Sequence, residues 1–374
     1  MSKKYEVKRV ETKSDRKKFI RFPFTVYRND PNWVPPIMME YKKMLTPGKH
    51  PYYEHGEVEF FMVFRDGELV GRTTAHTNTI HNEVHRDKIG FFGFFECQND
   101  RDATRALFDA AGEWLRKKGM DTIRGPLSFS QNEIAGLLID AFDTPAVFEM
   151  AYNPPYYVDL IEGYGFKKAN DLYAYRFFTK DEFPEKVYRM AELVKKRRGV
   201  VVRQVSFKDW DNELQKVKKI YNKAWTYNWG FCPITEREML KLASDLRPVC
   251  REDLVFLAFV DGEVVGVSVT MPDMNVIVKE IGGKLFPFGF LKLLFKTKHV
   301  KSVRVVIMGV IKEYQLMGID AVFYAETMKR AREIGITWGE MSWILEDNLP
   351  MRRVLENLGS EIYKTYRVYD YRLK

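Results

Sequence analysis

The chain has few cysteines and no long apolar run. Its 374 residues include three cysteines, Cys97, Cys232 and Cys250, which are odd in number and far apart. They form no disulfide framework, and no His–Asp arrangement near them indicates a thiol nucleophile. No segment approaches the roughly 20 apolar residues of a membrane-spanning helix. The charged start, residues 2–6, is unlike a signal peptide, so we expect a cytoplasmic protein.

Metal-ligand and nucleic-acid patterns are also missing. His76, His81 and His85 lie close together, but no cysteine or carboxylate spacing accompanies them. We interpret them as surface or packing residues and expect no metal. The net charge of +9 attracts anions, among them cofactor phosphates, acidic carrier proteins and anionic lipids. Since no zinc-knuckle, RNA-recognition or recognition-helix pattern is present, we expect no nucleic-acid partner.

What the sequence does contain is a repeat. Three pairs of similar segments share one shift of 195 residues: 66–71 with 261–266, 5–10 with 200–205, and 153–155 with 348–350. This period is far longer than that of solenoid repeats, and the chain exceeds the size at which single cores stop growing. We therefore predict two copies of one domain, residues 1–180 and 199–374, joined by a charged helical linker over 181–198.

Both copies predict the element order β-α-α-β-β-β-α-β-α-β. In the first copy we expect a strand over 5–11, a helix over 14–27, a hairpin turning at Asp66-Gly67, a strand over 89–96, a helix over 102–117 and a strand from Thr122. In the second we expect a strand over 200–206, a helix over 209–225, a hairpin turning at Asp261-Gly262, a strand over 303–308, a helix over 320–333, a strand over 338–345 and a helix from Asn348 to Gly359. Asp-Gly between apolar runs favours a tight hairpin because Gly accepts positive φ.

This order resembles the GNAT N-acyltransferase fold. The resemblance is carried by residues 305–321, particularly Tyr314-Gln315-Leu316-Met317-Gly318-Ile319-Asp320, where GNAT enzymes have a Q/R-x-x-G-x-G/A loop. It implies that backbone amides of the loop hold the pyrophosphate of coenzyme A, since exposed N–H groups and the helix dipole form an anion site. The predicted fold class is therefore mixed α/β, with two tandem GNAT-like domains.

The same resemblance implies a site for acyl-CoA or acetyl-CoA as co-substrate in the second copy. Its candidate residues are Met308, Val310, Gln315, Leu316, Met317, Gly318, Ile319, Asp320 and Asn348. Asp320 replaces the last small residue of the loop, and its carboxylate repels a pyrophosphate unless it turns away as a helix cap. The corresponding stretch of the first copy, 97–102, has no glycine, so we expect that copy to bind no cofactor and to buttress the second or shape the acceptor site.

Further stretches are similar to one branch of tandem GNAT proteins, the group related to bacterial ceramide synthases. They are residues 30–36, 93–96, 152–157, 272–275, 286–289, 346–348 and 364–367, so the match spans nearly the whole chain. The similarity implies amide formation between an acyl thioester and an amine, with a long-chain acyl group in at least some members.

Acyl transfer needs a base for the amine and donors for the thioester oxygen. Strand alternation puts Glu340, Ser342 and Glu346 on one face, and Glu346 ends the strand where a GNAT fold places the thioester. Glu346 is our candidate general base, directly or through water, and Glu340 is the reserve. The alternative for Glu346 is a solvated carboxylate at a strand end.

The resemblance also concerns the helix that follows this strand. Asn348 falls where GNAT proteins often carry an asparagine that contacts the cofactor, and it is also a good N-cap. The tyrosine that many GNAT enzymes place seven residues later is Leu355 here, so the usual proton donor to the thiolate is absent from that position. Tyr366 is our replacement, with Tyr363 and Tyr369 as alternatives, and packing is the other interpretation for all three.

Candidate acceptor-binding residues flank an insertion between the hairpin and the central strand. Asp273 and Asn275 follow the hairpin, where turn formation is the alternative, and Phe286 and Phe288 begin the insertion. On a helical projection of residues 283–298, Lys292 and Lys296 share one narrow face and apolar residues cover the rest. Lys298 and Lys301 extend the positive charge. Three interpretations stay open: a segment lying in a membrane surface, the wall of an acyl-chain tunnel, or a helix packed between the copies.

We therefore predict N-acyl transfer from an acyl-CoA or acyl-carrier-protein thioester to an amine, with the chemistry in the second copy. The acceptor that we favour is a lipid-like amine such as a sphingoid base. Two alternatives remain: acetyl-CoA-dependent acetylation of a small or protein amine, and a non-catalytic GNAT-fold binding protein, which Asp320 and Leu355 favour. Peripheral contact with an anionic membrane, at its inner face, is left open.

Overall fold

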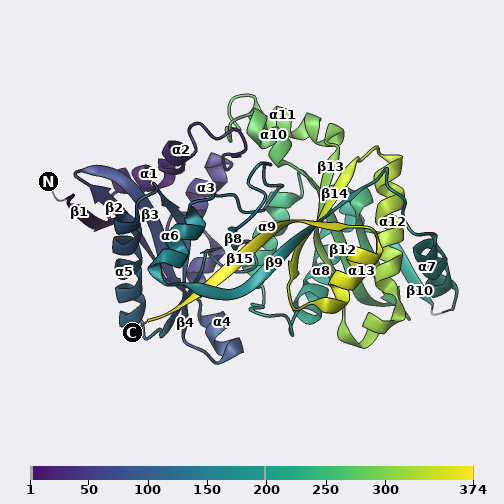
Figure 1. The fold of residues 1–374 in the computed structure, drawn as a ribbon. Coiled ribbons are helices and arrows are strands. Elements are labelled where there is room, and N and C mark those ends of the chain that lie inside the picture. The colour runs from purple at the N-terminus through teal and green to yellow at the C-terminus, as the bar shows by residue number, and fades with distance from the viewer. Residues whose placement is uncertain (1–2, 198, 374) are drawn as a thin grey trace. The chain divides into compact units, whose positions relative to one another are not determined.

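A computed structural model describes residues 3–197 and 199–373 of the chain (Figure 1). Contacts divide it into two compact units. The first unit is made of Met1–Leu172, Val278–Pro287 and Lys364–Lys374, and the second of Tyr173–Ile277 and Phe288–Tyr363. The predicted boundaries put the end of the chain in the second copy, whereas by contacts its last segment belongs to the first unit. Arg198, the last residue of the predicted linker, lies outside the described residues.

The first unit contains the predicted elements in the predicted order. They are β1 (Tyr5–Arg9), α1 (Lys13–Arg21), α2 (Pro23–Val26), α3 (Met38–Met44), β2 (Val58–Arg65), β3 (Glu68–Thr77), α4 (Thr79–His85), β4 (Ile89–Cys97), α5 (Arg101–Lys117), β5 (Thr122–Gly125), the short strands β6 (Leu127–Ser128), β7 (Ile134–Ala135) and β8 (Leu137–Leu138), and α6 (Tyr157–Tyr164). The sheet has the order β1-β2-β3-β4-β5-β15, where β15 (Glu361–Arg372) is the last strand of the chain. Only β4 and β5 run parallel within this order.

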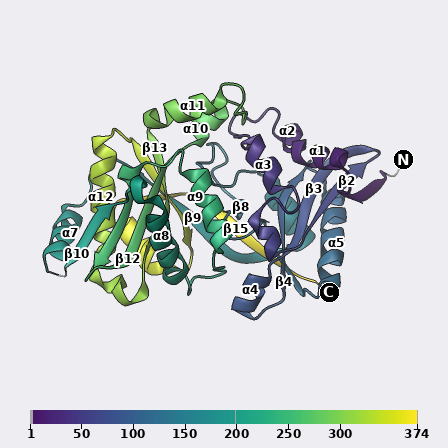
Figure 2. The ribbon, with the colours of Figure 1, turned by 180° about the vertical axis from the view of Figure 1, so that it is seen from behind.

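Both faces of this sheet are covered, as alternation along β2 shows. Phe61 and Val63 point into a core that includes buried residues of α5 and α6, whereas Phe60 and Met62 pack with Phe19 of α1 on the other side. Successive side chains of a strand point to opposite faces, so a continuous apolar run requires two apolar environments. Figures 1 and 2 show α5 and the α1–α3 segment on the two sides of these strands.

The second unit repeats this arrangement. Its elements are the end of β9 (Lys167–Phe178), α7 (Glu185–Arg197), β10 (Val200–Gln204), α8 (Trp210–Ala224), α9 (Glu236–Leu246), β11 (Val255–Val260), β12 (Glu263–Pro272), the start of α10 (Asn275–Glu280), α11 (Gly289–Lys296), β13 (Ser302–Val310), α12 (Ile319–Glu333), β14 (Trp338–Leu345) and α13 (Leu349–Asn357). The strand order is β9-β14-β13-β12-β11-β10, and β13 and β14 run parallel. The repeated order of elements, and with it the mixed α/β class, is confirmed.

The charged segment between the copies is a packed helix. Ala191 and Val194 of α7 are buried in one core together with Val322 and Phe323 of α12. Successive buried positions on α7 are four and then three residues apart, which is the spacing of one face of a helix. The segment that the sequence presents as a linker is thus part of the second unit's core.

Both hairpins turn at Asp-Gly, as predicted. Asp66 and Gly67 have φ of 50° and 87°, and Asp261 and Gly262 have φ of 49° and 81°. Positive φ at both central residues is the backbone of a type I′ turn, whose twist matches that of the flanking strands. The two copies of the sequence repeat therefore have the same type of turn at positions 195 residues apart.

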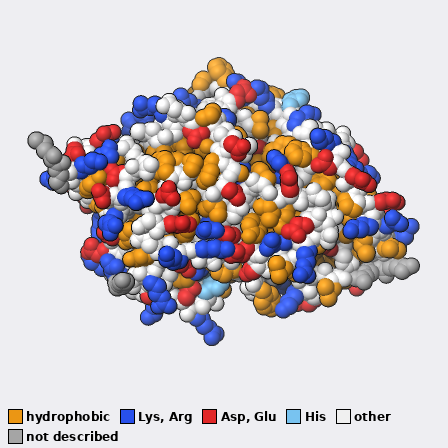
Figure 3. All heavy atoms as spheres, viewed as in Figure 1, with side chains coloured by type: hydrophobic (Ala, Val, Ile, Leu, Met, Phe, Trp, Pro, Cys, Tyr) orange, Lys and Arg blue, Asp and Glu red, His pale blue; other side chains and the backbone are white. Residues whose placement is uncertain are grey.

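The surface carries charges of both signs. On the face drawn in Figure 3, Lys and Arg side chains lie among Asp and Glu side chains, with hydrophobic side chains between them. No helix within the described part of the chain is long and apolar enough to cross a membrane.

Candidate functional site

The candidate site lies where two parallel strands of the second unit separate. β13 and β14 pair from Ser302 and Trp338 to Val305 and Met341, although both strands continue beyond this point. The carboxyl ends of parallel strands lie at the same edge of a sheet. The loop after β13 and the residues after β14 are therefore brought to one edge of the second unit, with unpaired strand edges leading to them.

A β-bulge lies at the point of separation. The register between β12 and β13 changes from Val269 opposite Ile307 to Thr270 opposite Val305, so that Val306 is skipped. A bulge bends its strand and turns a backbone group away from the ladder, and bulges are frequent beside active sites. The β13 backbone is thus irregular next to the opening.

The loop after β13 leads directly into a helix start. Residues Lys312–Met317 form a 3₁₀ turn, and Gly318 follows with φ of 79° as the N-cap of α12. A side chain at Gly318 would be strained by this φ, and its Cβ would lie 3.0 Å from Cγ2 of Val194. Glycine cannot cap the helix with a side chain, so the first N–H groups of α12 depend on other acceptors.

The loop is accessible and carries one charge of each sign, on Lys312 and Glu313. Leu316 is 95% exposed, and the exposed Lys312 has its ammonium 4.1 Å from the centre of the Tyr227 ring. The Gln315 side-chain amide donates to the carbonyl of Val310 over 3.2 Å and so ties the loop to the end of β13. An accessible helix start beside a lysine is suited to a phosphate group.

Asp320 occupies part of this helix start. Burial raises the pKa of its carboxyl, and hydrogen bonds from the backbone N–H groups of Asp320 itself and of Ala321 oppose that shift. These are two of the first N–H groups of α12. A phosphate bound here would therefore compete with this carboxylate for the same donors.

The remaining candidate co-substrate residues lie around the loop. Met308 packs beside the cores on both sides of β13, Val310 and Ile319 are buried, and Met317 packs against the core formed by α7 and α12. These side chains hold the loop in place. Only the loop's exposed part and the helix start present groups to a ligand.

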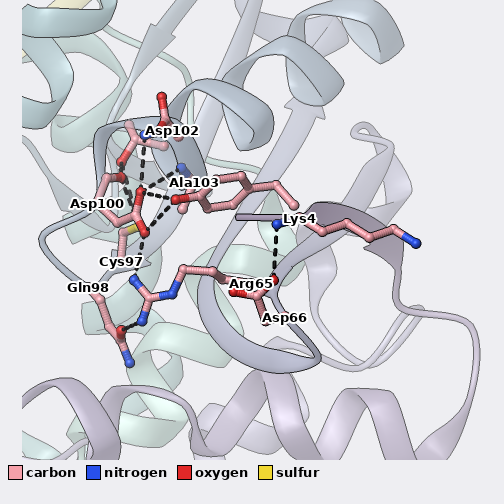
Figure 4. A network of polar contacts seen from close by, with 10 residues as sticks. Lys4, Arg65, Asp66, Cys97, Gln98, Asp100, Asp102 and Ala103 are labelled. Atoms are coloured by element: carbon pink, nitrogen blue, oxygen red, sulfur yellow. Dashed lines mark hydrogen bonds and ion pairs between the residues drawn. The ribbon is translucent and has the colours of Figure 1, made fainter. Parts of the chain in front are cut away.

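The equivalent helix start in the first unit is closed by the protein itself (Figure 4). Asp100 accepts hydrogen bonds from the N–H groups of Asp102 and Ala103, both over 3.1 Å. Arg65 donates to the same carboxylate over 2.7 Å, and the Tyr5 hydroxyl lies 3.0 Å from it. Burial alone would raise the pKa of Asp100, but these bonds outweigh it, and the pKa lies below its ordinary value. A permanent carboxylate takes the place that a ligand phosphate would need.

Glu340 is the centre of a buried polar network in the second unit. Its carboxylate accepts hydrogen bonds from the Ser342 hydroxyl over 2.5 Å and from the Tyr363 hydroxyl. Arg304 donates to the Ser342 hydroxyl over 2.9 Å and lies 4.0 Å from the carboxylate. Glu340 is fully buried, whereas Tyr363 is partly exposed.

Glu346 and Asn348 follow β14 at its open end. Glu346 is partly exposed, and its backbone carbonyl accepts a hydrogen bond from Arg352 over 2.9 Å. The Asn348 side chain accepts from the N–H of Met351 over 3.3 Å, so this residue is the N-cap of α13. Glu346 is thus held by a contact of its backbone, and the residue is partly exposed.

The tyrosine positions differ from one another. Leu355 is buried in a core of the second unit, in place of the tyrosine of many GNAT enzymes. Tyr366 is fully buried and belongs to the first unit by contacts, whereas Tyr363 belongs to the second unit and contacts Glu340. Tyr363 is therefore bonded to Glu340, which lies opposite Arg304 just before β13 and β14 separate.

The candidate acceptor residues fall into two groups. Asp273 is nearly buried, accepts from the N–H of Asn275 over 3.1 Å, and lies 3.4 Å from the Ser302 hydroxyl, so it organises the turn between β12 and α10. Phe286 and Phe288 have most of their side-chain surface exposed. The structure thus shows a turn at the first pair and surface residues at the second.

The histidines and cysteines have structural roles. The His76 ring lies 2.8 Å from the carbonyl of Phe129, and burial lowers its pKa to about 3. Burial raises the pKa of Cys97 and of Cys250 to about 12, so neither forms a thiolate near neutral pH. Among residues 3–197 and 199–373, no group of three or more His, Cys, Asp and Glu side chains is arranged to hold a metal ion.

Arg304 is the residue that sequence reasoning did not single out. It is almost fully buried in β13, and its guanidinium lies 5.2 Å from the centre of the Trp343 ring. The signal was available, because an arginine within the apolar run 303–308 needs a buried acceptor. Its partners, however, lie on other strands, and the sequence did not identify them.

The fold and this site define the class of protein. The chain matches a tandem GNAT protein from the clavulanic acid biosynthesis pathway with a TM-score of 0.58 and 13% identity, covering 99% of both chains. At this identity the likeness shows the fold, which is the predicted tandem GNAT fold. No protein-family model matches the chain.

Two relatives identify the family. The bacterial ceramide synthase of Caulobacter vibrioides is 38% identical over 368 residues, 96% of each chain. Protein YghO of Escherichia coli K12 is 36% identical over 365 residues, 96% of this chain and 93% of YghO. The chain belongs to the family of the bacterial ceramide synthase, as the motif resemblance predicted, and is a GNAT-type N-acyltransferase.

Proposed function

We propose that the protein transfers an acyl group from acyl-CoA to a lipid-like amine, with the chemistry in the second unit. The observation that carries the proposal is the opening between β13 and β14, which has the Gly318 helix start after one strand and Glu346 after the other. The helix start at Gly318 is suited to bind the phosphates of a thioester substrate, and Glu346 is suited to accept a proton from an amine. The relative named a ceramide synthase supports a lipid-like acceptor.

Binding of the thioester uses the start of α12. The N–H groups after Gly318 and the charge of Lys312 favour a pyrophosphate, and the helix dipole adds to the attraction. Asp320 weakens this binding without abolishing it, because its carboxylate leaves the donors when the phosphate arrives.

In the transfer step the amine nitrogen attacks the thioester carbonyl carbon. A C–N bond forms, the C–S bond breaks, and coenzyme A leaves as a thiolate that takes up a proton. The amine loses a proton to Glu346, directly or through one water molecule. A positioned base of this kind accelerates a reaction by about 10² to 10⁴-fold.

Glu340 has a different role in this proposal. It is buried and bonded to Ser342 and Tyr363, so it holds the ends of β13, β14 and β15 in register and keeps the Tyr363 hydroxyl in a fixed orientation. Tyr363 is then the proton donor to the thiolate that the Leu355 position lacks. Tyr363→Phe is expected to slow turnover, whereas Tyr366→Phe changes stability more than turnover.

Two experiments test the proposal. Calorimetric titration with coenzyme A, acetyl-CoA and palmitoyl-CoA should show binding that tightens with chain length. Mass spectrometry should then detect amide formation from palmitoyl-CoA and sphinganine. Binding of acetyl-CoA alone, with acetylation of a small amine, would favour the acetyltransferase alternative, and no binding of any thioester would favour a carrier-protein donor or a non-catalytic protein.

The base assignment has a matched control. Glu346→Gln should lower kcat about 100-fold at unchanged affinity for coenzyme A, the loss expected for a general base. The neighbouring exposed carboxylate in Asp347→Asn should keep kcat within about two-fold, since surface substitutions away from a site have small effects. Equal activity of Glu346→Gln and wild type would remove Glu346 from the mechanism.

A further inference from the structure

Helix α11 turns apolar side chains away from its own unit. Gly289 and Leu293 are buried, and Thr297, four residues further, is buried at the end of the helix. Phe288, Leu291 and Phe295 have 69%, 47% and 72% of their surface exposed. At about 100° per residue these three positions lie opposite the buried ones, on the outward face. We call Phe288, Leu291 and Phe295 the outward apolar face.

The flanks of this face are basic. Lys292 and Lys296 lie along one side of the outward apolar face, and Lys298 and Lys301 follow the helix; all four are exposed. The chain has no acidic residue between Glu280 and Glu313. In Figure 3, hydrophobic side chains lie beside Lys and Arg side chains at the upper margin, where Figure 1 draws α11.

We propose that the outward apolar face of α11 docks on the surface of an anionic lipid bilayer. Aromatic and aliphatic side chains on one side of a short helix enter the boundary of headgroups and acyl chains, while lysines at its margin meet anionic headgroups. Eight residues of helix span about 12 Å, far less than a bilayer, so α11 lies in the surface plane.

The composition of the face favours lipid over a protein partner. Lysine is depleted in the core of protein–protein interfaces, whereas it is typical of the polar margin of helices that lie on membranes. Exposed apolar patches of monomeric proteins mark interaction sites, and the four lysines give this one a positive charge that complements a negative bilayer. The proposal is independent of the proposed acyl transfer, because docking requires no turnover.

Vesicle sedimentation with the full chain tests the proposal. Wild type should bind vesicles of equal parts phosphatidylcholine and phosphatidylglycerol at low salt, and bind phosphatidylcholine vesicles weakly. The double variant L291S/F295S should lower the partition coefficient about 100-fold, because withdrawing each large apolar side chain from water contributes about a factor of ten. K292Q/K296Q should lower it about 20-fold at low salt, close to five-fold per lysine, and less in 1 M salt.

Matched controls come from exposed residues elsewhere in the same unit. V201S/L240S removes two apolar side chains of 59% and 46% exposure, and K223Q/K329Q removes two exposed lysines. Both controls should bind vesicles like wild type. All four double variants change residues on the surface. Thermal melting curves equal to that of wild type confirm that their folding is unchanged.

Three results would overturn the proposal. The first is that wild type does not bind anionic vesicles at low salt. The second is that L291S/F295S binds as well as V201S/L240S. The third is a concentration-dependent dimer in sedimentation velocity that L291S/F295S dissociates without a change in vesicle binding, which would assign the outward apolar face to a second copy of the chain.

Discussion

The helix after the central strand begins differently in the two units. At the start of α5 the Asp100 carboxylate accepts from two N–H groups and is held by Arg65 and Tyr5. At the start of α12 the N-cap is Gly318, and the nearest carboxylate, Asp320, lies inside the helix. The first copy thus closes this helix start with the Asp100 carboxylate, whereas in the second copy the N-cap has no side chain and the Asp320 carboxylate accepts from N–H groups of the first turn.

The strands that lead to these helix starts also differ, because the strand of the first unit is the more buried one. β4 is buried along nearly its whole length, and a Cβ at Gly93 would lie 1.8 Å from the carbonyl oxygen of Leu127 in β6. β13 is half-exposed at several positions beyond Val305, where its pairing with β14 ends. The carbonyl of Leu127 thus fills the space beside Gly93 in the first unit.

The largest expected effect concerns the buried network of the second unit. Arg304→Met should lower the free energy of unfolding by about 3 kcal/mol, because the Glu340 carboxylate stays buried without the nearby positive charge. Hydrogen exchange should increase in β13 and β14 and stay unchanged in β3 and β4. A variant as stable as wild type would mean that Ser342 and Tyr363 alone satisfy the carboxylate.

The second prediction breaks the seal in the first unit. Asp100→Ala removes the cap of α5 and leaves Arg65 without its carboxylate, so the free energy of unfolding should fall by about 2 kcal/mol. Urea denaturation measures this change, and Asp102→Ala, an exposed acid in the same helical turn, is the control. Affinity for coenzyme A should not change; a new coenzyme A site in Asp100→Ala would show that the carboxylate alone had closed the first copy.

The third prediction opens the second unit further. Asp320→Gly frees the N–H groups that its carboxylate occupies, so affinity for coenzyme A should rise about ten-fold, equal to about 1.4 kcal/mol. Asp320→Asn, which keeps the shape and removes the charge, should give part of this gain. Unchanged binding in calorimetry for both variants would show that the protein tolerates the carboxylate, and the contrast between the helix starts would then rest on Asp100.

The smallest expected effect distinguishes the units by pH. The buried His76 takes up a proton in the folded state only near pH 3, whereas the unfolded chain does so near pH 6.5. Between these values the unfolded state binds more protons, so stability falls as pH falls, by about 1 kcal/mol from pH 7 to 6. The pKa values of Glu213 and Asp253 in the second unit are lowered to about 2. Their contribution to the free energy of unfolding is therefore lost only in stronger acid.

Hydrogen exchange at pH 7 and 6, corrected for intrinsic rates, measures this difference. Peptides of β3 and β4 should lose protection at pH 6 while peptides of β11 and β12 keep theirs. His76→Phe should remove part of the pH dependence of the first unit and leave the part due to His81, whose pKa burial also lowers to about 3. A larger loss of protection in β11 and β12 than in β3 and β4 would contradict the assignment to His76.

Much of the fold was predictable because the signals are local. The Asp-Gly turns, the apolar alternation of the hairpin strands and the cap at Asn348 depend on residues a few positions apart, and the structure has each of them. The Gly318 loop was predicted from its resemblance to the loop of GNAT enzymes. For the first copy, the sequence predicted only that the loop glycine is missing. It did not predict that Asp100 closes the helix start, since Arg65 and Tyr5, which hold its carboxylate, come from other strands.

The parts that were not predicted depend on distant residues. The network around Glu340 joins side chains of β13, β14 and β15, and the sequence contains no mark of which acceptor Arg304 meets. The outward apolar face of α11 was not predicted for the same reason. A helical projection shows where its lysines and apolar residues lie, but not which side the rest of the unit covers.

The sequence by itself determined the duplication, the order of elements and the hairpin turns, because short-range backbone preferences and strand alternation decide these. Only the tertiary structure decided that residues 369–372 of β15 pair with β5 of the first unit, that α7 is core, and that α11 turns phenylalanines outward. The physical reason is that burial is a property of the assembled chain. An apolar side chain gains the same free energy from any surface that removes it from water, and the choice of surface belongs to the fold.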